Sequence, residues 1–123
     1  MTTTFERPVF ARVRKLCLRL PETTEVSAWG HPNFRVGRKT FCALEIVRDM
    51  PTVAFHVTPA EGALLLQRND CFATPYGRGR WVSMRVDGRI DWTLVGRLVR
   101  HSYRTVAGKR LLAALDAAPA RGD

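Results

Sequence analysis

Residues 33–36 alternate between polar and apolar side chains, and this alternation predicts a strand with one buried face. Residues 41–46 are mostly apolar, which predicts a strand that is covered on both faces. Between these segments, residues 36–39 indicate a tight hairpin turn, in which Gly37 is free to take the positive φ that such turns require. This hairpin is the centre of the predicted fold.

Three further segments have strand patterns. Residues 25–29 predict a short first strand with Val26 directed inward, residues 52–57 predict a fourth strand, and residues 80–86 predict a fifth. On the fifth strand, the side chains expected to face inward are Val82, Met84 and Val86, and those expected to face outward are Trp81, Ser83 and Arg85. Because short turns join the first four strands, consecutive strands must pair antiparallel.

Helices are predicted at both ends of the chain. Apolar residues at three- and four-residue steps predict a helix over residues 8–20, which Pro21 ends. Thr58, with Glu61 three residues later, has the spacing of a capping box, which predicts that a short helix begins here. Asp91 is the predicted N-cap of a longer helix that ends at Gly108, and one or two helical turns follow.

This order of elements predicts a two-layer α+β sandwich, in which an antiparallel sheet of about five strands has helices packed on one face. A chain of 123 residues suits a single domain. We expect that domain to span residues 1–116 and residues 117–123 to form a disordered tail. Residues 70–79 contain several glycines and a proline and are expected to form a loop.

The composition is strongly basic, with a formal net charge of +9. This charge makes polyanions the first partners to consider: nucleic acid, an anionic membrane surface or an acidic protein. The alternative is an arginine-rich solvated surface that binds nothing.

Several classes of protein are not expected from this sequence. Cys17 and Cys42 have no paired spacing and are expected to be buried thiols in a reducing compartment. No segment is typical of a membrane span or a signal peptide, so we expect a cytoplasmic protein that does not enter the membrane. No metal site or cofactor is expected, because candidate ligands do not recur at a metal-binding spacing. The usual hydrolase, metalloprotease and nucleotide-binding motifs are missing, so we expect no enzymatic activity.

Cations gather in three intervals that contain no acidic residue. The groups are Arg35, Arg38 and Lys39 in the hairpin, Arg78, Arg80 and Arg85 around the start of the last strand, and Arg97, Arg100, Arg104, Lys109 and Arg110 in the final helices. The first two groups are expected to border the outward face of the sheet, where cations beside an exposed aromatic side chain suit contacts with a nucleic-acid backbone and its bases.

Two residues near these cations have alternative interpretations. Trp81 either stacks on a base or is covered by the preceding loop as part of the core. His31, before Pro32, either contacts a phosphate or base, acts as a general acid or base, or is a structural corner bonded to a backbone carbonyl. The predicted nucleic-acid-binding residues are Arg35, Arg38, Lys39, Arg78, Arg80, Arg85, Trp81 and His31.

Seven short motifs resemble, in order, those of the MmcQ/YjbR family. They are Leu-Cys-Leu-Arg-Leu-Pro at residues 16–21, Trp-Gly-His-Pro-Asn-Phe-Arg-Val-Gly at 29–37, Thr-Pro-Tyr at 74–76, Arg-Trp-Val-Ser at 80–83, Val-Asp-Gly at 86–88, Asp-Trp at 91–92 and Ser-Tyr-Arg at 102–104. The resemblance implies a frataxin-like or secretion-chaperone-like sandwich, and a double-wing DNA-binding motif made of two hairpin wings.

Two functional hypotheses follow. In the first, the protein binds DNA without sequence preference through its basic wings. In the second, it is a protein-interaction or chaperone-like module that uses the open sheet face, as a monomer or weak homodimer. High salt would abolish polyanion binding and spare apolar docking.

Overall fold

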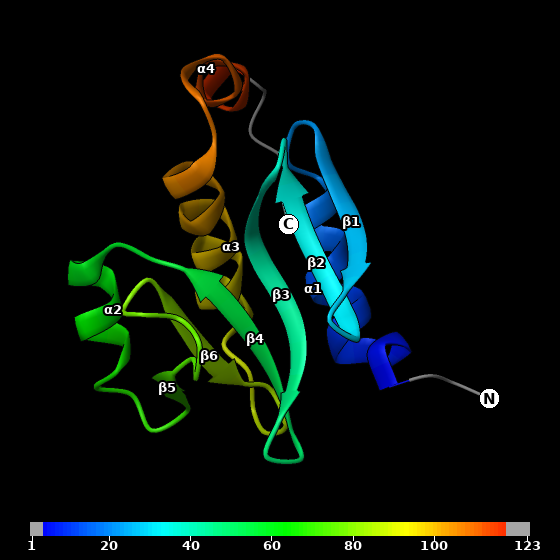
Figure 1. The fold of residues 1–123 in the computed structure, drawn as a ribbon, viewed down its shortest axis with the longest axis vertical. Helices are drawn as coiled ribbons and strands as arrows, with labels where there is room; N and C mark the ends of the chain where they lie inside the picture. The colour runs from blue at the N-terminus through cyan, green and yellow to red at the C-terminus, as the bar shows by residue number, and fades with distance from the viewer. Residues whose placement is uncertain (1–3, 118–123) are drawn as a thin grey trace.

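The computed structural model describes residues 4–117 of the chain and contains one antiparallel sheet (Figure 1). The strands lie in the order β1-β2-β3-β4-β6-β5. Their bounds are β1 Thr23–Ala28, β2 His31–Val36, β3 Lys39–Val47, β4 Met50–His56, β5 Cys71–Ala73 and β6 Trp81–Arg85. The helices are the 3-10 helix η1 Thr4–Glu6, and α1 Pro8–Leu18, α2 Pro59–Leu65, α3 Trp92–Val106 and α4 Lys109–Ala117.

Helices α1 and α3 lie behind the sheet in Figure 1, and neither covers the face toward the viewer. The core fills the space between these helices and the sheet, where Phe10, Phe41, Phe55 and Tyr103 are fully buried. The Phe41 and Tyr103 rings meet edge-on, with centroids 5.4 Å apart. The Tyr103 hydroxyl donates a hydrogen bond of 2.8 Å to the Pro21 carbonyl, which ties α3 to the start of β1.

The predicted fold class is confirmed, as are several local features. Thr58 and Glu61 form a capping box at the start of α2, and the Asp91 side chain accepts a hydrogen bond from the Leu94 amide at the start of α3. On β6 the alternation is as expected, since Val82 and Met84 belong to the core. Cys17, Cys42 and Cys71 are buried free thiols.

Three expectations need correction. Cys71–Ala73 forms the edge strand β5 inside the segment expected to be a loop, because a three-residue strand is too short to give a periodic signal. Val26 pairs with Asn33 on the face away from the helices, while its neighbour Glu25 bonds to Arg14 of α1. Ala117 still belongs to α4, and the rest of the expected tail, residues 118–123, lies outside the described residues.

The β2–β3 pairing shifts register between Phe34 and Arg35. This irregularity lets two successive residues of β3, Phe41 and Cys42, both lie in the core. The β3–β4 pairing ends at Cys42, whereas the β2–β3 pairing continues to Lys39. The β2–β3 hairpin therefore extends past β4 at this end of the sheet.

Candidate nucleic-acid interface

The face of the sheet opposite α1 and α3 is hollowed by a pocket of about 970 Å³. Its lining comes from η1, the turn between β1 and β2, strands β2 and β3, the loop before β6 and the start of β6. It includes Trp29, His31, Asn33, Glu45, Tyr76 and Trp81. Trp29 is 84% exposed at the rim of this pocket. The open face thus combines aromatic rings with a few polar groups, as ligand pockets do.

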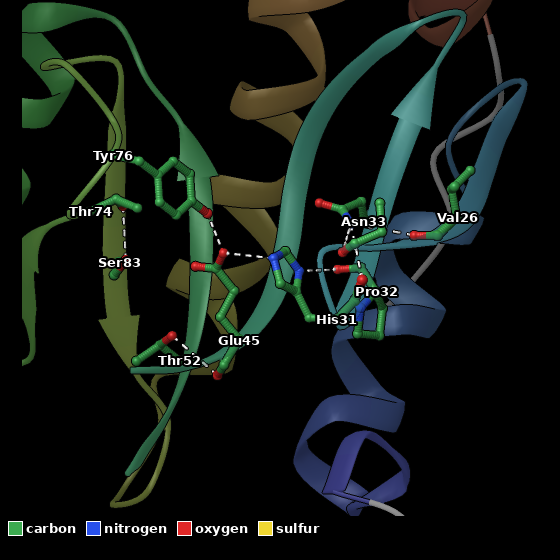
Figure 2. A network of polar contacts seen from close by, with 10 residues as sticks. Val26, His31, Pro32, Asn33, Glu45, Thr52, Thr74, Tyr76 and Ser83 are labelled. Atoms are coloured by element: carbon green, nitrogen blue, oxygen red, sulfur yellow. Dashed lines mark hydrogen bonds and ion pairs between the residues drawn. The ribbon is translucent and has the colours of Figure 1, made fainter. Parts of the chain in front are cut away.

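A buried carboxylate, that of Glu45, lies in the lining of the pocket (Figure 2). Its Oε2 lies 3.1 Å from His31 Nε2 and accepts a hydrogen bond from the Tyr76 hydroxyl. Its Oε1 is buried and has no hydrogen-bond partner within residues 4–117. Burial, followed by the Glu45 carboxylate, raises the pKa of the Tyr76 hydroxyl well above its usual value, so that the phenol stays protonated and donates.

Asn33 holds the turn between β1 and β2. Its side-chain amide donates to the carbonyls of Ala28 and His31, at 3.2 and 3.0 Å. In this turn Trp29 and Gly30 have φ values of 53° and 81°, in the left-handed region that favours glycine. The Asn33 bonds (Figure 2) therefore stabilise a turn that keeps the Trp29 side chain in solvent.

The loop before β6 packs closely on Trp81. A Cβ atom at Gly77 would lie 2.6 Å from the Cβ of Trp81, so only glycine fits there. Trp81 is nevertheless half-buried, lines the pocket and meets the His56 ring edge-on at 5.3 Å between centroids. The loop therefore covers only part of Trp81, and another part of the residue faces the pocket.

Five of the predicted cations lie at one end of the sheet. They are Arg35, Arg38, Lys39, Arg78 and Arg80, from the end of β2, the start of β3 and the loop before β6. Within the described part of the chain none of them forms an ion pair with an acidic residue. Arg35 donates a hydrogen bond of 3.2 Å to the Thr40 hydroxyl. The positive charge predicted for this hairpin is therefore not neutralised by described carboxylates.

His56 ends β4, and its pKa depends on a cation from each of the two basic segments. Its Nδ1 lies 2.7 Å from the Thr105 hydroxyl oxygen on α3. Burial is the main cause that lowers the pKa of His56, and the charges of Arg80 and Lys39 lower it further. Lys39 begins β3 and Arg80 immediately precedes β6, and these two strands flank β4, which ends at His56.

The remaining candidates lie elsewhere. Arg85 is at the opposite end of β6, where it pairs with Asp87 at 3.0 Å. His31 begins β2, at the opposite end of that strand from the hairpin turn, and its Nδ1 lies 3.3 Å from the Pro32 carbonyl. Its two ring nitrogens thus both face oxygen atoms of the protein. Arg35, Arg38, Lys39, Arg78 and Arg80 thus lie at one end of the sheet in two groups that β4 separates, and Trp81 follows the second group. Arg85 and His31 lie away from that end.

Similarity to known proteins agrees with this fold. A family model described as YjbR matches residues 18–105, more than half of the sequence. The chain belongs to the YjbR family. The resemblance noted from the sequence motifs is therefore confirmed.

Two solved structures resemble this YjbR-family protein. Protein DR2400 of Deinococcus radiodurans, with a domain described as DUF419, has a TM-score of 0.71 and 24% sequence identity over 86% of both chains. A protein from Pseudomonas syringae has a TM-score of 0.63 and 14% identity, covering 86% of this chain and 100% of the other. At such identities the likeness extends to the fold alone. No curated protein matches the chain.

Sequence reasoning missed Glu45 and Tyr76 as members of a polar network. The available signal for Glu45 was a single acidic residue inside the apolar segment 41–46, since a carboxylate in a buried strand needs a partner. Tyr76 had no such signal, because 31 positions separate it from Glu45 and only the fold brings them together.

The described part of the chain has neither a cluster of metal ligands nor a membrane-spanning helix. Residues 4–117 contain no group of three or more metal-ligating side chains. No helix in the same range is long and apolar enough to cross a bilayer.

Proposed function

We propose that this YjbR-family protein binds duplex DNA without sequence preference, through the cations at the hairpin end of its sheet. The observation that carries the proposal is that two basic segments, the β2–β3 hairpin and the loop before β6, lie at one end of the sheet and form no ion pair with an acidic residue of the described chain. A DNA backbone that passes along this end of the sheet would meet the cations of both segments. The role is one of binding and requires no catalytic group.

The charge at this end of the sheet is suited to phosphates. Arg38, Lys39, Arg78 and Arg80 are exposed and have no acidic partner among the described residues. Phosphate contacts position a protein on DNA and carry no sequence information. If these four cations and Arg35 all contact phosphates, the affinity should fall with salt along a log–log slope of roughly −4 to −5.

The test removes two exposed charges from the hairpin. Arg38→Ala with Lys39→Ala should leave the fold intact, because neither side chain is buried or ion-paired in the described structure. Duplex binding should weaken for every sequence tried, and the salt slope should shrink by about 2 in magnitude, roughly one unit per lost phosphate contact. Fluorescence anisotropy with two unrelated labelled duplexes, over a salt series, measures both quantities.

A matched control keeps the charge change the same. Arg97→Ala with Arg100→Ala also removes two exposed arginines, from α3, and should change the slope much less. If the hairpin variant binds duplex with the affinity and salt slope of the parent, the proposal is wrong. It is also wrong if the two variants weaken binding equally, because net charge alone would then account for the effect.

A second candidate function is docking of a protein partner on the open face. The exposure of Trp29, Ile46 and Tyr76 around one pocket favours it. This mode depends on apolar contact, so a partner that remains bound in high salt would support it, and Trp29→Ala should then weaken the complex. DNA binding through the hairpin would instead be lost in high salt.

A further inference from the structure

A second basic feature lies on the helical side of the molecule, between α1 and α3. There the two helices border a groove of about 770 Å³. Five cations line it, namely Arg12, Lys15, Arg19, Arg97 and Arg100, and no acidic residue within positions 4–117 does so. This groove lies on the opposite side of the sheet from the pocket of the open face.

Helical spacing explains how the cations converge. Arg12, Lys15 and Arg19 are three and four positions apart, so they lie on one side of α1 and the turn that follows it. Arg97 and Arg100 are three apart and lie on one side of α3. At 1.5 Å per residue, the α1 cations span roughly 10 Å along the helix.

Other features keep the groove open and leave several of its cations without an ion pair in the described part of the chain. Arg12 lies over the Trp92 ring, 4.2 Å from its centroid, which fixes that guanidinium at the groove. Gly96 also lines the groove, and a Cβ atom built there would meet no other atom within 4 Å. Among the described residues, Lys15, Arg97 and Arg100 make no ion pair. Like charges held together in this way oppose folding, unless an anion neutralises them.

We propose that the α1–α3 groove binds a compact polyphosphate, such as the triphosphate group of a nucleotide or a short inorganic polyphosphate chain. Cations from two facing helices, among them Lys15, Arg97 and Arg100, match a ligand that concentrates several negative charges in a short length. Duplex DNA spreads its charge over both strands at about one charge per 1.7 Å of axis, so few of its phosphates would enter a groove between two helices.

The experiment uses inorganic tripolyphosphate as the probe and the full chain as the protein. Isothermal titration calorimetry should detect binding to the parent, and Arg97→Ala with Arg100→Ala should weaken it by at least about tenfold, as expected for the loss of two charge-assisted contacts. The matched control is the hairpin variant, Arg38→Ala with Lys39→Ala, which removes the same amount of charge from the other side of the molecule. It should bind tripolyphosphate as the parent does.

Two further measurements make the result decisive. Orthophosphate at equal ionic strength should bind far more weakly than tripolyphosphate, because it presents fewer charges to the groove. The groove variant, Arg97→Ala with Arg100→Ala, should lose less affinity for a single-stranded dodecanucleotide than for tripolyphosphate. The inference is overturned if the groove variant binds tripolyphosphate as tightly as the parent does, or if both variants lose the same affinity for tripolyphosphate. It is also overturned if the groove variant loses affinity for the dodecanucleotide alone.

The two proposals fail independently. Loss of duplex binding in the hairpin variant, with tripolyphosphate binding unchanged, supports both. Failure of the groove variant to affect tripolyphosphate leaves the duplex result intact and refutes the groove alone.

Discussion

His56 is the residue that responds to both basic segments of the proposed interface. Its pKa is lowered by burial first and then by Arg80 and Lys39. Because the pKa in the folded state lies below the unfolded value of about 6.5, the folded protein binds the proton less readily. The contribution of His56 to stability is therefore present above about pH 6.5 and is lost as the pH falls through the lowered pKa.

Removing either nearby cation should raise the pKa of His56. Arg80→Ala should raise it more than Lys39→Ala, since Arg80 has the larger effect, and burial should keep it below the usual value in both variants. Titration of the imidazole signals by NMR measures the change. An unchanged pKa of His56 in both variants would mean that the charges of Arg80 and Lys39 do not influence this imidazole.

Glu45 illustrates what a single residue in the sequence leaves open. A carboxylate that is 5% exposed must be paired or hydrogen-bonded, so its burial alone predicts partners. The identity of those partners was not predictable, because His31 and Tyr76 come from positions far apart in the chain. His31 Nδ1 also faces a backbone carbonyl oxygen, which is the contact expected for a structural corner.

At the scale of elements, the loop between β5 and β6 depends on close packing of Gly77. Three backbone hydrogen bonds close this loop, from Thr74 to Trp81, from Gly77 to Thr74 and from Arg80 to Gly77. The Thr74 and Ser83 hydroxyls are 2.8 Å apart and bind the loop to β6. The loop therefore holds Arg78 and Arg80 at the end of β6.

Gly77→Ala should destabilise the protein by roughly 1–3 kcal/mol, because the added methyl group meets the Trp81 Cβ and backbone. Gly88→Ala is the matched control, since a Cβ there has no neighbour within 4 Å. Denaturant unfolding measures both changes in free energy. Equal effects of the two substitutions would contradict the packing argument.

At the scale of the whole molecule, the excess positive charge is divided between two sides. One group lies at the hairpin end of the sheet, and the other lines the groove between α1 and α3. Several arginines elsewhere are already paired, such as Arg14 with Glu25 and Arg110 with Glu22. The formal charge of +9 thus gathers in the parts of the surface that lack carboxylates.

Salt should stabilise this protein, because screening reduces the repulsion among its cations. Thermal unfolding should therefore occur at a higher temperature in about 500 mM than in about 50 mM sodium chloride, because the Debye length is below about 10 Å only at the higher concentration. The Arg97→Ala and Arg100→Ala double variant should be more stable than the parent at low salt, by roughly 0.5–1 kcal/mol if a few like-charge pairs are relieved. Scanning calorimetry measures both, and a less stable double variant would contradict repulsion in the groove.

The sequence by itself determined the order and type of the long elements, the caps at Thr58 and Asp91 and the family, because periodicity, capping and motifs are local properties. Tertiary structure alone decided the edge strand β5, the position of Val26 and the placing of Lys39 and Arg80 on the two strands that flank β4. It also decided that cations of α1 and α3 face one another across a groove. The physical reason is that pairing at a sheet edge and packing between helices depend on residues far apart in the chain, which no local pattern encodes.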